Sequence, residues 1–88
     1  MLVKQDSHLF ELTYGPKSSK EALISSLIQK FNVKINIIAG SIEIISSQSV
    51  GRLIIIISGN DRNVSEGKRH LVDNGVVVKE VIRNDLFK

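Results

Sequence analysis

The sequence has no cysteine and no tryptophan, and its 88 residues include only one proline, one tyrosine and three phenylalanines. The lack of cysteine excludes disulfides, zinc–thiolate sites, iron–sulfur ligation and a cysteine nucleophile, and it fits a cytoplasmic setting. The longest uninterrupted apolar run is Leu53–Ile57, far shorter than the ~20 residues of a membrane-spanning helix. The opening residues Met1–Asp6 lack the apolar stretch of a signal peptide. Length and composition therefore predict one small globular domain.

Charge of either sign is not concentrated in any part of the sequence. Twelve basic and nine acidic residues give a net charge of +3, and the basic residues are scattered. This pattern is typical of a mixed, solvated surface rather than of a nucleic-acid patch. A sheet that binds RNA also needs aromatic side chains on its central strands to stack the bases, whereas the most apolar segment here is aliphatic. We therefore expect no nucleic-acid partner.

Motifs of catalysis are missing as well. The sequence contains no P-loop spacing, no G-x-S-x-G and no H-E-x-x-H. His8 and His70 are isolated from each other and are expected to be solvated. Glu11, Glu43 and Glu80 fall on different predicted strands, without the pairing of a general acid and base. We expect this domain to have no catalytic residue, no bound metal and no cofactor.

The aliphatic residues that are present are mostly isoleucine and valine, which favour strands. Hydrophobic periodicity separates these strands from two amphipathic helices. Ser18 and Glu21 have the spacing of a capping box at the start of the first helix, and Asn63 or Asp61 is expected to cap the second. The predicted elements are strand 8–14, helix 19–31, strand 34–45, polar turn 46–49, strand 51–58, a helix that stops at Asn74-Gly75, and strand 76–82.

The order βαββαβ predicts the fold class. With right-handed crossovers it gives an α+β, ferredoxin-like and ACT-like fold, in which a four-stranded antiparallel sheet has both helices on one face. The second helix would turn Val64, Gly67 and Leu71 inward, and Gly67 would allow a close approach to the sheet. Residues 8–82 are expected to form this domain, with 1–7 as a polar linker and 83–88 as a tail.

The segment KINIIAGSIEII, residues 34–45, changes the parity of its apolar residues. Ile35 and Ile37 have one parity and Ile42 and Ile44 the other, and Gly40 between them is expected to allow a bulge or bend. The third strand is apolar at both parities, which predicts cover on both faces. Because the helices cover only one face, we expect a second copy of the chain on the other. The expected interface residues are Ile35, Ile42, Ile44, Ile55 and Ile57.

Asn36 is the one polar side chain among these isoleucines. Its amide either bonds to neighbouring backbone or faces water on an edge strand. Alternatively, it is a polar anchor in an apolar groove, which would suit a small ligand with an apolar tail and charged ends. The spacing leaves both interpretations open.

The stretch Phe31–Glu43 resembles the NIL domain, which is named for an Asn-Ile-Leu signature. Asn36-Ile37-Ile38 stands at the signature, with isoleucine in place of leucine. The resemblance continues through Gly51 at the start of the third strand, Gly59 at its end and Asn74–Val76 after the second helix. It covers about residues 8–82, and the joint order and spacing of these features carry it.

The resemblance implies a function. NIL domains are C-terminal regulatory domains of the ATP-binding subunit of methionine ABC importers, on the cytoplasmic side of the membrane. They form homodimers and bind methionine, and occupancy inhibits further uptake. The implied partners are methionine, a second copy, an ATPase domain and a transmembrane subunit. ATP and Mg would bind in the ATPase domain, which lies outside this sequence.

The same resemblance suggests a ligand site at Asn36, Ile37, Ile38, Gly40 and Ser41. Asn36 and Gly40 match the family pattern, and the other three are included because they adjoin those positions. Two alternatives stay open at this point. One is a dimerisation module without a ligand. The other is a small acyl-phosphate hydrolase, although residues 14–18 supply a lysine and not the arginine that this chemistry uses.

Overall fold

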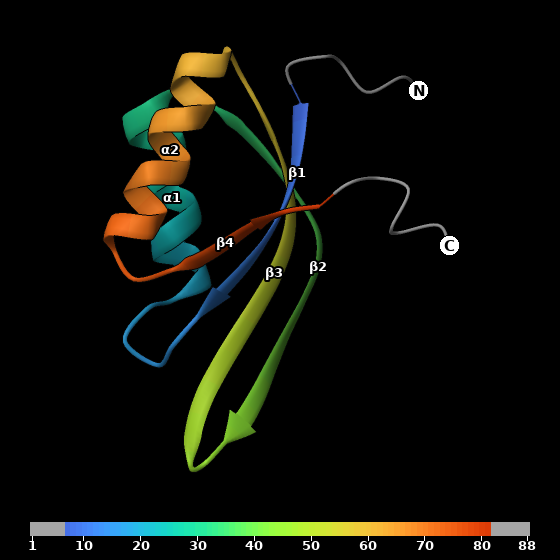
Figure 1. Cartoon of the computed structure of the whole chain (residues 1–88), viewed down its shortest axis with the longest axis vertical. Helices are drawn as coiled ribbons and strands as arrows, with labels where there is room; N and C mark the ends of the chain where they lie inside the picture. The colour runs from blue at the N-terminus through green and yellow to red at the C-terminus, as the bar shows by residue number, and fades with distance from the viewer. Residues whose placement is uncertain (1–6, 82–88) are drawn as a thin grey trace.

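A computed structural model describes residues 7–81 and has the predicted order of elements, with both helices on one face of a sheet (Figure 1). The four strands are antiparallel and lie in the order β2-β3-β1-β4. The predicted α+β, ferredoxin-like fold is therefore confirmed. The elements are β1 (Ser7–Tyr14), α1 (Lys20–Phe31), β2 (Lys34–Ile45), β3 (Gln48–Ser58), α2 (Asp61–Asp73) and β4 (Val77–Glu80).

The expected ends of the domain are only partly within the described residues. The predicted linker 1–7 and tail 83–88 lie outside them, except that Ser7 already belongs to β1 and pairs with Ser58. Within the described residues, neither helix is long and apolar enough to cross a membrane.

Both helices begin one residue away from the predicted caps. Ser19, not Ser18, caps α1, and its Oγ accepts a hydrogen bond from the Ala22 N–H at 3.2 Å. Asn60 caps α2, where its Oδ1 accepts from the Asn63 N–H at 2.8 Å. Several neighbouring residues in each loop are chemically able to cap a helix, so the loop geometry decides which one does. In the first loop, a turn bond from the Ser18 N–H to the Gly15 carbonyl takes Ser18 out of the helix.

A tight turn joins β2 to β3. Only Ser46 and Ser47 lie between the strands, with φ of 52° and 67°. Positive φ at both central residues is what a two-residue type I′ turn requires. The predicted turn over residues 46–49 was too long, and β3 begins at Gln48 rather than at Gly51. The polar composition of the segment conceals the fact that strand pairing continues through it.

The core lies between the sheet and the helices. Its largest fully buried side chains come from β1, β3 and both helices: Leu12, Leu27, Leu53, Ile55, Ile57 and Leu71. Gly67 of α2 lies closest to the other helix, because a Cβ there would sit 3.3 Å from Cδ2 of Leu27 and 4.0 Å from Cδ1 of Ile57. The expected close approach is therefore mainly between the two helices rather than between helix and sheet.

A β-bulge explains the change of parity in β2. Ile37 pairs with Ile55 and Ala39 with Ile54, which leaves Ile38 as the extra residue. An extra residue moves every later side chain to the opposite face. The isoleucines on both sides of the bulge therefore point the same way, toward the helices. The expected bulge at Gly40 was two residues too late.

The expected interface isoleucines all lie on this helix-covered side, and their placement on the open face was wrong. Residues directly opposite each other in an antiparallel pair point to the same face. Ile55 and Ile57 are fully buried in the core. Ile35 pairs with Ile57, and Ile42 and Ile44 follow the bulge on the same side. The open face instead presents Leu9, Ile54 and Ile56 together with charged residues.

The β2–β3 hairpin extends beyond both helices (Figure 1). Ile42 and Ile44 lie in this overhanging part, where they are 72 % and 71 % exposed although they face the helical side. Two large, exposed apolar side chains on one hairpin form an apolar surface to which a ligand or a partner can bind.

Candidate functional site

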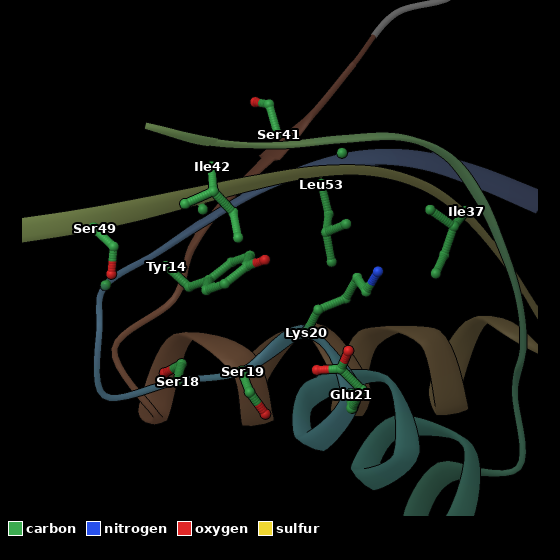
Figure 2. Close-up of a pocket in the computed structure, with 13 residues that line it drawn as sticks. Tyr14, Ser18, Ser19, Lys20, Glu21, Ile37, Ser41, Ile42, Ser49 and Leu53 are labelled. Carbon is green, nitrogen blue, oxygen red and sulfur yellow. The ribbon is translucent and has the colours of Figure 1, made fainter. Parts of the chain in front are cut away.

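The overhanging hairpin and the start of α1 line a hollow with a volume of about 630 Å³ (Figure 2). This volume is within the range of small-molecule sites, about 300–1,000 Å³. The hollow is lined by Tyr14, Gly15, Ser18, Ser19, Lys20, Glu21, Ile37, Gly40, Ser41, Ile42, Ser49, Gly51 and Leu53.

The sheet supplies an aliphatic wall. Ile37, Ile42 and Leu53 point from β2 and β3 toward the helical side (Figure 2). Gly40 leaves room for the Leu53 side chain in this wall, because a Cβ at position 40 would lie 3.0 Å from Cδ2 of Leu53. A more open hollow of about 390 Å³ shares Lys20, Glu21 and Ile37 with the first one. It continues along α1 past Ile28, which is 47 % exposed.

Tyr14 forms one end of the hollow. Its side chain comes from the end of β1, and its hydroxyl points toward the centre (Figure 2). Tyr14 is only 8 % exposed, and its hydroxyl makes no hydrogen bond with any of residues 7–81. Gly51 on β3 makes room for the ring, because a Cβ there would overlap the ring and lie 2.6 Å from the hydroxyl oxygen.

The first turn of α1 supplies the polar groups. The cap satisfies the Ala22 N–H, and the Leu23 N–H bonds to the Ser19 carbonyl. The N–H groups of Lys20 and Glu21 precede the repeating bonds of the helix and point out of its N-terminal end. The helix dipole makes this end favourable for an anion. The Lys20 and Glu21 side chains add one charge of each sign at the mouth of the hollow (Figure 2).

The structure divides the predicted ligand residues between the two sides of the sheet. Ile37, Gly40 and Ser41 line the hollow, although the Ser41 side chain points away from it (Figure 2). Ile38 is the extra residue of the bulge and is 51 % exposed. Asn36 pairs with Ile56 and is exposed on the open face. Its role in ligand binding stays a prediction, and a ligand that it contacts would lie on that face.

Sequence reasoning missed Tyr14, Lys20 and Glu21. The parity of β1, with Phe10 and Leu12 inward, places Tyr14 on the helix side and was a usable signal for it. Lys20 and Glu21 carried no such signal, because charged residues in a first helical turn are common on any surface. Only the loop path and the overhang of the hairpin bring them next to β2.

Other polar pairs lie away from the hollow. His70, expected to be solvated, is half-buried, with its Nε2 3.0 Å from Oγ of Ser26. His8 is also half-buried, with its Nδ1 3.0 Å from Oε2 of Glu80. Neither pair lines the hollow. Among residues 7–81, no group of three or more His, Cys, Asp or Glu side chains is placed to hold a metal ion.

Comparison with known proteins gives a consistent result. The family model of the NIL domain matches residues 8–80. The chain is 29 % identical over 80 residues to the methionine import ATP-binding protein MetN of Lacticaseibacillus paracasei, covering 91 % of this chain and 23 % of that protein. It is 34 % identical over 70 residues to MetN of Streptococcus pyogenes, covering 80 % and 20 %. The chain thus spans about a fifth of the length of the curated relatives it matches.

A solved structure has the same architecture. The C-terminal domain of an ABC transporter ATP-binding protein from Enterococcus faecalis superposes with a TM-score of 0.72 at 24 % sequence identity. The superposition covers 86 % of this chain and 84 % of that one. At this level of identity the likeness supports the fold.

Proposed function

Since this chain belongs to the NIL domain family, we propose that it is the regulatory, methionine-binding domain of the ATP-binding subunit of a methionine ABC importer. The names of the relatives favour this transporter as the parent protein. ATP and Mg²⁺ would be bound and used in the parent's ATPase domain. The present domain would catalyse nothing and would sit on the cytoplasmic side of the membrane, next to the ATPase domain and the transmembrane subunit.

The observation that carries the proposal is the hollow between the β2–β3 hairpin and α1. It joins an aliphatic wall to a few polar groups, which is the general make-up of a small-molecule site. Methionine has an unbranched thioether side chain and a zwitterionic head group. The side chain matches the wall at Ile37, Ile42 and Leu53, and the head group matches the charged start of α1.

Regulation would follow from differential binding. A ligand shifts a conformational equilibrium only if it binds one state more tightly than the other. Cytoplasmic methionine bound in the hollow would favour the conformation of the transporter subunit in which the hairpin is held against α1. Coupling of about 1–3 kcal/mol between sites is typical of allosteric proteins. This would be enough to reduce import several-fold when internal methionine is abundant.

The homodimer is proposed through the open face of the sheet. Ile54 and Ile56 of β3 keep part of their surface exposed on this face, and Leu9 of β1, which pairs with Ile56, is already almost fully buried, so the two isoleucines form the aliphatic strip that is open to a partner. The strip is flanked by charges of both signs, among them Glu11 and Arg52. A second copy, related by a two-fold axis, would cover the strip and place acidic side chains opposite basic ones.

The same strip favours a second candidate function, a dimerisation module without a ligand. Sedimentation velocity separates the two candidates when it is combined with calorimetry. A dimer that releases no heat with any amino acid would support the module. Replacement of Ile56 by glutamate is expected to convert the dimer into monomers in either case, whereas Val72→Glu is the matched control, because Val72 is an exposed apolar residue of α2 on the other side of the sheet. A chain that sediments as a monomer at high concentration would rule out the proposed interface.

The methionine proposal is tested by isothermal titration calorimetry on the 88-residue chain. We expect saturable heat with L-methionine and a rise in the melting temperature as methionine is added, because a ligand that binds only the folded state stabilises it. L-Alanine, which lacks the long side chain, is expected to bind at least tenfold more weakly. The absence of both heat and a thermal shift at millimolar methionine would contradict the proposal.

A further inference from the structure

We propose that the chain has a second ligand site, for a compound with two or more linked phosphate groups, in a hollow between the two helices. The helices lie side by side on one face of the sheet (Figure 1). This inter-helix hollow has a volume of about 510 Å³ and is lined by the β1–α1 loop, one side of α1 and the end of α2. It shares only Ser18 and Ser19 with the hollow between the hairpin and α1. The site goes beyond the proposed function and does not depend on it.

Positive charge without compensating negative charge is the first argument. Lys17 of the loop and Lys30 in the last turn of α1 line the inter-helix hollow, and among residues 7–81 no acidic residue does. Within the same residues, no carboxylate lies within 4.0 Å of either ammonium group. Glu66 and Asp73 of α2 instead pair with arginines one turn earlier on the same helix. The hollow therefore attracts an anion.

The hydroxyl of Ser26 is the second argument, because its neighbours determine the direction of its hydrogen bond. Nε2 of His70 lies 3.0 Å from Oγ of Ser26, and Nδ1 lies 3.5 Å from Nδ2 of Asn74. The amide nitrogen of Asn74 can only donate, and a 2.8 Å bond to the His70 carbonyl sets its orientation. In the neutral ring Nδ1 is therefore the acceptor, and Nε2 carries the hydrogen and donates it to Oγ of Ser26.

This arrangement leaves the hydroxyl hydrogen of Ser26 available to a ligand. Among residues 7–81, Oγ of Ser26 has no hydrogen-bond partner other than His70. The His70 ring is also held by Phe31, with the ring centroids 5.2 Å apart. A donor that is already fixed loses little freedom when a ligand binds, and a bond from it to an anionic oxygen is a strong one. Ser26 would thus contact the ligand, and His70 would be a positioning residue.

The length of the hollow decides the class of anion. Its α1 wall extends from Ser19 to Lys30, which is roughly 16 Å of helix. A single phosphate or sulfate is too short to reach both Lys17 at the loop end and Lys30 at the far end. Linked phosphate groups spread negative charge along the wall and can also place an oxygen at Ser26. Since most of the lining residues are polar, an apolar ligand would gain little from this surface.

Isothermal titration calorimetry of the 88-residue chain with sodium diphosphate, at constant ionic strength, tests the proposal. We expect saturable binding that is at least tenfold tighter than that of orthophosphate. Lys17→Met and Lys30→Met are each expected to raise the dissociation constant for diphosphate at least fivefold. Lys34→Met is the matched control, because it removes the same charge from β2 but lines none of the three hollows; it should bind within twofold of the parent.

The positioning role of His70 has a readout of its own. Ser26→Ala and His70→Phe are each expected to raise the dissociation constant for diphosphate several-fold. In the Ser26→Ala chain, His70→Phe should add no further loss, because both substitutions remove the same oriented donor. Thermal unfolding without ligand checks that each variant is folded. An equal loss from His70→Phe in both backgrounds would overturn the positioning role.

The outcomes also separate this site from the methionine proposal. If diphosphate releases no heat with the folded parent chain, the site is overturned, whatever the result with methionine. Equal losses in Lys17→Met and Lys34→Met would show a response to net charge alone and would overturn it too. Binding of a tetraglutamate peptide without binding of diphosphate would assign the hollow to an acidic protein segment instead. ADP distinguishes the source of the phosphates: equal affinity supports free diphosphate, and much tighter binding of ADP supports a nucleotide.

Discussion

Replacement of Ile55 by alanine is expected to lower the free energy of unfolding by about 2–5 kcal/mol, the usual cost of truncating a fully buried isoleucine. Ile55 is 0 % exposed and packs in the core between β1, β3 and the helices. Single domains are stable by only about 5–15 kcal/mol. One such cavity in a chain of this size therefore removes a large part of the total stability. Chemical denaturation followed by circular dichroism measures the change.

The control for this prediction is Ile44→Ala. Both isoleucines face the helical side, but Ile44 lies on the overhanging hairpin and is 71 % exposed. Its truncation is expected to change stability by less than about 0.5 kcal/mol, as is usual at the surface. Equal effects at the two positions would show that the hairpin packs against something else, or that β3 has a different register.

Gly51→Ala is expected to lower the free energy of unfolding by about 1–3 kcal/mol, the typical cost of overpacking a closely packed site. The new methyl group would overlap the ring of Tyr14 and lie 2.6 Å from its hydroxyl oxygen. Because the ring is almost fully buried, it can move only into the hollow. The same substitution should therefore weaken methionine binding strongly, which thermal unfolding and calorimetry would detect together.

Gly15→Ala provides the comparison, since no atom lies within 4 Å of a Cβ at that position. It should leave both stability and binding close to those of the parent. If Gly51→Ala were as stable as Gly15→Ala and still bound methionine, then Tyr14 would not be wedged between β3 and the hollow.

Much of the fold could be predicted from the sequence, because local patterns determine it. The apolar stripe of α1, the stop at Asn74-Gly75 and the parity of Phe10 and Leu12 each follow from short-range chemistry. The faces of β2 and β3 could not be predicted this way. An uninterrupted aliphatic run gives no indication of which parity is inward. The bulge at Ile38 has no distinctive residue, so the expected bulge was assigned to the nearby Gly40.

The ligand-binding role of the expected residues stays a prediction, and the structure places only some of them at the hollow. Three of the expected ligand residues, Ile37, Gly40 and Ser41, line the hollow. Asn36 attracted attention because it is polar, but its parity places it on the other face. The hollow also depends on how far the hairpin extends past the helices. This length is set by a two-residue turn within a segment that looked like a longer loop.

The account depends on an aliphatic hollow on the helix side of the sheet that binds methionine. Nuclear magnetic resonance with labelled isoleucine methyl groups tests this most directly, because the two faces carry different isoleucines. Addition of methionine is predicted to shift the methyl signals of Ile37 and Ile42 and to leave those of Ile54 and Ile56 unchanged. Shifts confined to Ile54 and Ile56, or no shifts at saturating methionine, would contradict the account.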